Sequence, residues 1–99
     1  MRPIHLARMD KTRPVLVLTR GSQTMSRRVT VAGITSIVRG GRTEVLVGPT
    51  NGLDHDCAVN LDDIVTIERR LLGSLVGYLH DDQEPALHAA VVRAFDLED

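Results

Sequence analysis

Runs of apolar residues divide most of the chain into short segments with the character of strands. Residues 15–18 form a continuous aliphatic run, which is typical of a strand buried on both faces. Residues 28–35 alternate instead, with Val29 and Val31 on one face of the predicted strand. Shorter strands are predicted over residues 44–47, 57–61, 64–67 and 75–79, and a single helical turn over residues 69–72.

Turn signals separate these strands at Gly21-Ser22, Gly40-Gly41, Asn51-Gly52 and Gly73. Short strands divided by such turns favour a small barrel over an α/β sheet. One helix is predicted over residues 82–95, where apolar residues recur at helical spacing as Leu87, Ala90, Val91, Ala94 and Phe95. Pro85 fits best at the first helical position. The pattern therefore predicts one mainly β domain over residues 1–99, with an amphipathic C-terminal helix packed against the barrel.

Charge is distributed unevenly, which the net charge of −1 conceals. Residues 1–43 contain nine basic side chains and one acid, whereas residues 44–99 contain three basic side chains and twelve acids. The halves thus carry formal charges of +8 and −9. This asymmetry favours a basic surface for a polyanion or an acidic partner, unless the halves interleave in the fold and their fields cancel.

Several classes of site are excluded by composition. Cys57 is the only cysteine, so neither an internal disulfide nor a cysteine zinc cluster is available. No metal-binding spacing appears among the four histidines, and we expect no metal and no cofactor. The chain shows no signal peptide and no apolar run near the ~20 residues that span a bilayer. We therefore expect a cytoplasmic protein with no membrane contact.

Three motifs follow one another along nearly the whole chain: residues 13–18 (RPVLVL), 34–36 (ITS) and 56–67 (DCAVNLDDIVTI). Their order and spacing resemble the MazF/PemK family of toxin ribonucleases. The resemblance implies an SH3-like barrel that forms a homodimer, cleaves single-stranded RNA without a metal and is inhibited by a MazE-like antitoxin. The chain departs from the family in its very short loop before Arg13 and in its acidic pair Asp62-Asp63, which leaves the substrate groove and the RNA motif open.

Cleaving RNA without a metal requires attack of the 2′-hydroxyl on the adjacent phosphate and stabilisation of the charge that develops there. A guanidinium suits this second task because it stays charged and presents a planar fork of donors. The resemblance assigns this role to Arg13, and assigns Thr35 to binding the phosphate or relaying a proton. A threonine is a poor general base, so the base stays open. Asp62 is a third catalytic candidate, with a turn residue as the alternative interpretation.

An RNA-binding surface is predicted around Thr35 from the resemblance and the local charge. It comprises Lys11, Arg27, Arg28, Ser36, Arg39 and Arg42. Gly40-Gly41, placed between two arginines, predicts a mobile basic loop that follows a phosphate backbone. For any single arginine, a solvated surface charge is the alternative.

Two other functions are compatible with the pattern. Toxins of the same barrel superfamily poison DNA gyrase by binding it, and a fold alone does not determine function. A degenerate toxin that only binds an antitoxin is the other alternative. An acidic, apolar antitoxin segment lying across the basic half would compete with RNA, so we expect its inhibition to weaken with added salt.

Overall fold

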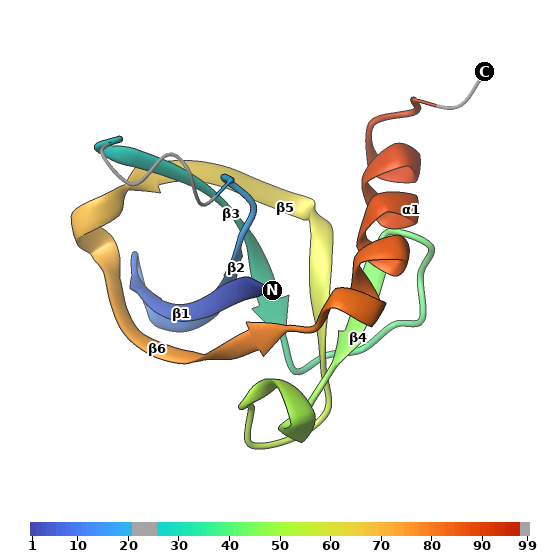
Figure 1. The fold of residues 1–99 in the computed structure, drawn as a ribbon, viewed down its shortest axis with the longest axis horizontal. Helices are drawn as coiled ribbons and strands as arrows, with labels where there is room; N and C mark the ends of the chain where they lie inside the picture. The colour runs from blue at the N-terminus through green and yellow to red at the C-terminus, as the bar shows by residue number, and fades with distance from the viewer. Residues whose placement is uncertain (21–25, 98–99) are drawn as a thin grey trace.

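The computed structural model describes residues 1–20 and 26–97, which form strands, short 3₁₀ turns and a helix (Figure 1). The strands are β1 (Arg2–Arg8), β2 (Thr12–Val17), β3 (Arg28–Thr35), β4 (Glu44–Val47), β5 (Cys57–Glu68) and β6 (Leu72–Leu79). The 3₁₀ turns are η1 (Pro49–Asn51), η2 (Arg69–Leu71) and η3 (Asp81–Gln83), and the helix is α1 (Glu84–Ala94).

These strands form one antiparallel sheet in the order β4-β5-β3-β2-β1-β6. Figure 1 shows that the sheet curls, with β6 following β5 through η2 and α1 standing outside the curl beside β4. Register shifts in the β1–β6 and β3–β5 ladders mark bulges, which bend strands and help a sheet to curl. The predicted small, mainly β barrel with a C-terminal helix is confirmed.

Two apolar clusters occupy the two faces of the curled sheet. One lies against α1 and includes Leu16 and Leu87. The other includes Val15 and Val17. Consecutive residues of β2 therefore enter different clusters, which explains the unbroken aliphatic run over residues 15–18. Burial of each such side chain contributes roughly 1.5–3 kcal/mol to stability.

The two strands predicted on either side of Asp62-Asp63 are one strand, β5. Its pairing with β3 changes register at this point, because Ala32 lies opposite Ile64 whereas Gly33 lies opposite Asn60. The intervening residues of β5 therefore have no partner on β3. The prediction of two strands was wrong because a bulge accommodates the acidic pair without taking the chain out of the sheet.

Other boundaries differ from the prediction by a few residues. The strands over residues 28–35 and 44–47 and the helical turn after Glu68 are confirmed, while β2 and β6 begin earlier than predicted, at Thr12 and Leu72. The predicted helix begins as η3 and becomes α-helical at Glu84, so that Pro85 is its second residue and not its first. The turn predicted at Gly21-Ser22 lies outside the described residues.

None of the described helices is long and apolar enough to cross a membrane.

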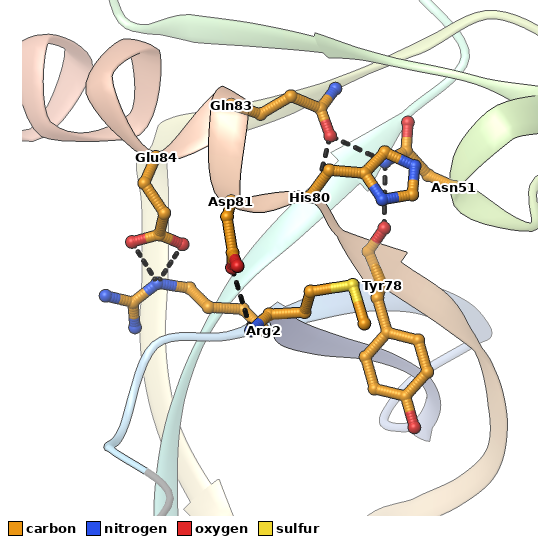
Figure 2. A network of polar contacts seen from close by, with 8 residues as sticks. Arg2, Asn51, Tyr78, His80, Asp81, Gln83 and Glu84 are labelled. Carbon is orange, nitrogen blue, oxygen red and sulfur yellow. Dashed lines mark hydrogen bonds and ion pairs between the residues drawn. The ribbon is translucent and has the colours of Figure 1, made fainter.

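A polar network joins η1, the end of β6 and η3 (Figure 2). The buried Asn51 donates from its side-chain nitrogen to the carbonyl oxygen of Tyr78 at 2.8 Å and to Oε1 of Gln83 at 2.7 Å. Its Oδ1 accepts the backbone N–H of Gly48 at 3.1 Å, and Gln83 Oε1 also accepts the N–H of His80 at 2.9 Å. Because the amide oxygen and nitrogen of Asn51 both have partners inside the protein, this network fastens the helix entry to the sheet.

The same region brings two backbone segments into close contact. A Cβ added at Gly77 would lie 2.7 Å from the carbonyl carbon of Asn51 and 3.1 Å from Cα of Gly52. Nearby, Arg2 forms an ion pair with Glu84 at 2.9 Å (Figure 2). The N-terminal amine is paired in the same way with an acidic residue of η3. The basic first half and the acidic second half therefore meet here, as the interleaving alternative supposed.

Candidate active site

A hollow of about 250 Å³ opens between the β1–β2 turn and strands β2, β3 and β5. It is lined by Met9, Asp10, Arg13, Val15, Val31, Gly33, Asp63 and Val65. Val15 and Val31 are fully buried, whereas the three charged residues are exposed. The hollow therefore has an apolar floor, and one guanidinium and two carboxylates surround it.

Arg13 lies in β2 opposite Ala7 of β1, and its side chain is exposed. Its guanidinium makes no hydrogen bond or ion pair with any other residue that the structure describes. Arg2 differs, because its guanidinium binds Glu84 and the carbonyl oxygen of Leu18. The N–H donors of Arg13 are therefore available to a ligand, and their fork matches two oxygens of a phosphate.

Thr35 is the last residue of β3. The β2–β3 ladder ends where Val15 lies opposite Gly33. Beyond that pair the two strands no longer pair, and Arg13 lies opposite Ala7 of β1 while Thr35 lies opposite Ala58 of β5. By strand alternation, Arg13 and Thr35 are on the same face as Val15 and Gly33. The Thr35 hydroxyl oxygen accepts the backbone N–H of Ile37 at 3.1 Å, which leaves the hydroxyl hydrogen free to be donated. The two predicted catalytic residues therefore lie at the same end of β2 and β3, and of the two only Arg13 lines the hollow.

The two residues of the acidic pair have different surroundings. The carboxylate of Asp62 accepts the hydroxyl of Thr43 at 2.7 Å, and Thr43 directly precedes β4, on the far side of β5 from β3. Asp63 lines the hollow, and its Cγ would lie 3.2 Å from a Cβ added at Gly33. Of the two, it is Asp63 that shares the hollow with Arg13.

The predicted RNA-binding residues divide into two groups. One group lies in the turn before Arg13 and in the connection after Thr35: Lys11, Ser36, Arg39 and Arg42. The other group is Arg27, directly before β3, and Arg28, the first residue of β3, which lies about 23 Å along the strand from Thr35. None of the six lines the hollow, and Arg42 lines a separate one with Val92, Arg93 and Asp96 of the helix end.

The connection between β3 and β4 is organised around one carboxylate. Glu44 accepts the backbone N–H groups of Arg39 at 3.2 Å, Gly40 at 2.8 Å and Gly41 at 3.3 Å. Gly40 has a φ of +73°, a left-handed conformation that glycine adopts without strain. This arrangement leaves the side chains of Arg39 and Arg42 exposed, where they can attract phosphates.

Sequence reasoning missed Asp63 and Gly33. Adjacent residues of a strand point to opposite faces, so the bulge in β5 decides which member of the acidic pair faces the hollow. No local pattern reveals that register. Gly33 did carry a signal, because a glycine within an alternating strand often marks a bulge or a close approach of another segment.

Cys57 is buried in the apolar cluster that lies against α1. Burial raises the pKa of its thiol, and the nearby carboxylates of Asp56 and Asp54 raise it further. A raised pKa disfavours the thiolate form that a nucleophilic cysteine requires. Within residues 1–20 and 26–97, no three His, Cys, Asp or Glu side chains are grouped closely enough to hold a metal ion.

Comparison with known proteins identifies the family. The model of the PemK-like, MazF-like toxin of type II toxin–antitoxin systems matches residues 3–95. The chain is 50% identical to Endoribonuclease MazF3 of Mycobacterium tuberculosis, over 99% of this chain and 96% of that protein. The structure matches M. tuberculosis toxin MazF-mt6 with a TM-score of 0.95 and 49% identity, over 99% of this chain and 100% of that chain. A MazE–MazF structure from Deinococcus radiodurans shares the fold at 17% identity, with a TM-score of 0.76 over 95% of this chain and 90% of that chain. The chain therefore belongs to the PemK-like, MazF-like toxin family of type II toxin–antitoxin systems.

Proposed function

We propose that this toxin is a cytoplasmic endoribonuclease that cuts single-stranded RNA without a metal, by attack of the 2′-hydroxyl on the adjacent phosphate. The proposal extends to this chain the activity named for its 50% identical relative. The observation that carries it is the guanidinium of Arg13, which has no partner among the described residues and lies at the same end of the sheet as Thr35. An exposed guanidinium whose donors are not used within the protein is a site for an anionic ligand.

In this mechanism Arg13 binds the nonbridging oxygens of the scissile phosphate and stabilises the charge that accumulates as the phosphorane forms. Thr35 donates its hydroxyl hydrogen to the same phosphate. Because both residues lie on strands, their positions are held more rigidly than those of loop residues. The products are a 2′,3′-cyclic phosphate (or a 3′-phosphate after its hydrolysis) and a 5′-hydroxyl. Asp62 stays a predicted third residue of the site, with its carboxylate bound to Thr43.

The surrounding basic side chains bind the RNA backbone on either side of the cut. Lys11 is exposed in the turn before Arg13, and Ser36 and Arg39 are exposed in the connection after Thr35. Arg42 lines a separate hollow with Arg93 and Asp96 at the end of α1. Arg27 and Arg28, at the far end of β3, would contact only RNA that extends beyond the cleaved dinucleotide. Binding through several phosphates releases counterions, so affinity should fall steeply with added salt.

We further propose that the toxin assembles as a homodimer and is inhibited by a MazE-like antitoxin. Exposed apolar side chains on β4 and in the segment before it support a surface for protein partners. They are Ile37, Val38 and Leu46, with 64%, 41% and 66% of their surface accessible.

The experiment that tests the activity is cleavage of a long RNA of mixed sequence by the purified toxin in excess EDTA, with the new ends mapped. We expect cuts at a short recurring motif, leaving 5′-hydroxyl ends. Arg13→Ala should abolish cutting while the fold is retained. Arg70→Ala, which removes an exposed arginine that pairs with Glu68, should cut normally. A folded, antitoxin-free wild type that leaves RNA intact would favour the gyrase-binding or degenerate alternative.

A further inference from the structure

We propose that Asp63 is the general base that accepts the proton of the attacking 2′-hydroxyl, and that Gly33 provides the space in which its carboxylate lies. This assignment rests on the proposed ribonuclease function and identifies the base that sequence reasoning left open.

The bulge in β5 places Asp63 at the site. Ladder pairing with β3 resumes at Ile64, directly after Asp63, so Asp63 stands at the edge of the unpaired stretch. From there it lines the same hollow as Arg13, whereas Asp62 is bound to Thr43. Figure 1 shows β5 running beside β3, the strand that carries Gly33 and ends in Thr35.

Gly33 makes this placement possible. A Cβ at this position would collide with the Oδ2 atom of Asp63 and approach its Cγ to 3.2 Å. The collision involves the end of a flexible side chain and no backbone atom. An alanine at position 33 is therefore accommodated by rotation of Asp63, which moves the carboxylate out of its place above β3. The absence of a side chain at Gly33 on β3 therefore leaves room for the carboxylate of Asp63 on β5.

The chemistry of the hollow selects a carboxylate as the base. Arg13 has no lone pair to offer at neutral pH, and a threonine hydroxyl is a poor base. The carboxylate of Asp63 makes no hydrogen bond or ion pair with the residues described, so its oxygens are free acceptors. Asp10, the other carboxylate of the hollow, belongs to the exposed turn between β1 and β2. A base on a strand is held more firmly than one in a turn.

The 2′-hydroxyl proton passes to an Oδ atom of Asp63 as the 2′-oxygen forms a bond to phosphorus. The bond between phosphorus and the 5′-oxygen breaks, its electron pair remains on the 5′-oxygen, and that oxygen takes a proton from solvent water. The carboxylic acid of Asp63 then returns its proton to solvent. Arg13 holds the phosphate throughout.

Single-turnover cleavage rates of full-length variants test the assignment, together with binding to an RNA whose cut site carries a 2′-deoxy sugar and cannot react. Asp63→Asn should lower the rate by about 100-fold or more and leave binding within about threefold of wild type. Asp62→Asn and Asp10→Asn should each cost less than Asp63→Asn. Asp82→Asn, a change at an exposed carboxylate of η3, should cut like wild type.

Gly33→Ala provides a test that keeps every charge in place. It should lower the rate by roughly 10- to 100-fold, because displacement of a reacting group by about 1 Å has effects of this size. In the Asp63→Asn background the same change should have almost no further effect, since the two act through one carboxylate.

The assignment is overturned if Asp63→Asn cuts normally, if Asp62→Asn or Asp10→Asn loses more activity, or if Gly33→Ala has its full effect without the Asp63 carboxylate. If Arg13→Ala is inactive while Asp63→Asn is fully active, the ribonuclease proposal stands and only the base is wrong. If the wild type does not cut RNA, both fall together.

Discussion

Two polar clusters of this toxin are each assembled from distant segments of the chain. They differ in whether their polar groups bind one another. Around Asn51, side-chain and backbone groups of η1, β6 and η3 bind one another (Figure 2). Around Arg13, a guanidinium and the carboxylate of Asp63 share a hollow without an internal partner among the described residues.

This difference distinguishes polar groups that stabilise the fold from polar groups that are available to a ligand. A buried polar group must find a partner inside the protein, because leaving it unpaired costs about 1–3 kcal/mol. An exposed polar group can instead keep its hydrogen-bonding capacity for a ligand, since water satisfies it in the meantime. The Asn51 network therefore stabilises the fold, and the Arg13 hollow is where a ligand finds available donors and acceptors.

The two glycines that border these clusters give the sharpest contrast and the largest expected effect. At Gly77 an added Cβ meets the backbone of Asn51, whereas at Gly33 it meets the end of the Asp63 side chain. Gly77→Ala should therefore lower the unfolding free energy by about 4 kcal/mol or more, which denaturant titration measures. Gly41→Ala, which adds a Cβ with nothing within 4 Å, is the matched control and should stay stable. A stable Gly77→Ala would contradict the close contact.

Truncation of the network itself comes next. Asn51→Ala removes three side-chain hydrogen bonds, and at about 1 kcal/mol each it should destabilise the fold by about 3 kcal/mol. RNA cleavage, measured at a temperature where the variant is folded, should be unchanged. Lost cleavage in a variant of normal stability would mean that the two clusters are not separate.

At the hollow, Thr35→Val should leave stability nearly unchanged and reduce kcat/KM for RNA by about 10- to 100-fold. The reason is that a hydrogen bond to a charged group contributes roughly 1.5–3 kcal/mol. Thr35→Ser keeps the hydroxyl and should restore most of the activity. If valine and serine behave alike, the hydroxyl of Thr35 does not bind the reacting phosphate.

The smallest expected effect concerns Cys57, near the Asn51 network. Burial favours its neutral thiol, so the pKa is higher in the folded than in the unfolded protein. The unfolding free energy should therefore fall as pH rises above 9.0, the ordinary pKa of the thiol, by at most about 1.4 kcal/mol per pH unit. The measurement is stability against pH for wild type and Cys57→Ala, and the alanine variant should show the shallower decline. Identical slopes would mean that the thiol is not shielded.

Part of the site could be predicted from the sequence because it lies in continuous motifs. Arg13 lies at the beginning of an aliphatic strand and Thr35 ends an alternating one, and the antiparallel pairing of these strands puts the two residues at the same end of the sheet. Which residue of the acidic pair faces the hollow could not be predicted in this way. A shift of one residue in a strand exchanges its faces, so the choice between Asp62 and Asp63 depends on a bulge that local patterns do not encode.

The sequence by itself determined the fold class, the helix and the positions of most strands, because apolar periodicity is a local property that burial enforces. Its motifs also identified the toxin family. Only the tertiary structure decided that Asp63 and not Asp62 faces the hollow, and that Arg27 and Arg28 lie far from Thr35. It also decided that Arg2 is bound to Glu84, whereas Arg13 has no partner among the described residues. These features depend on register and on contacts between residues distant in the chain, which no periodicity within one segment can specify.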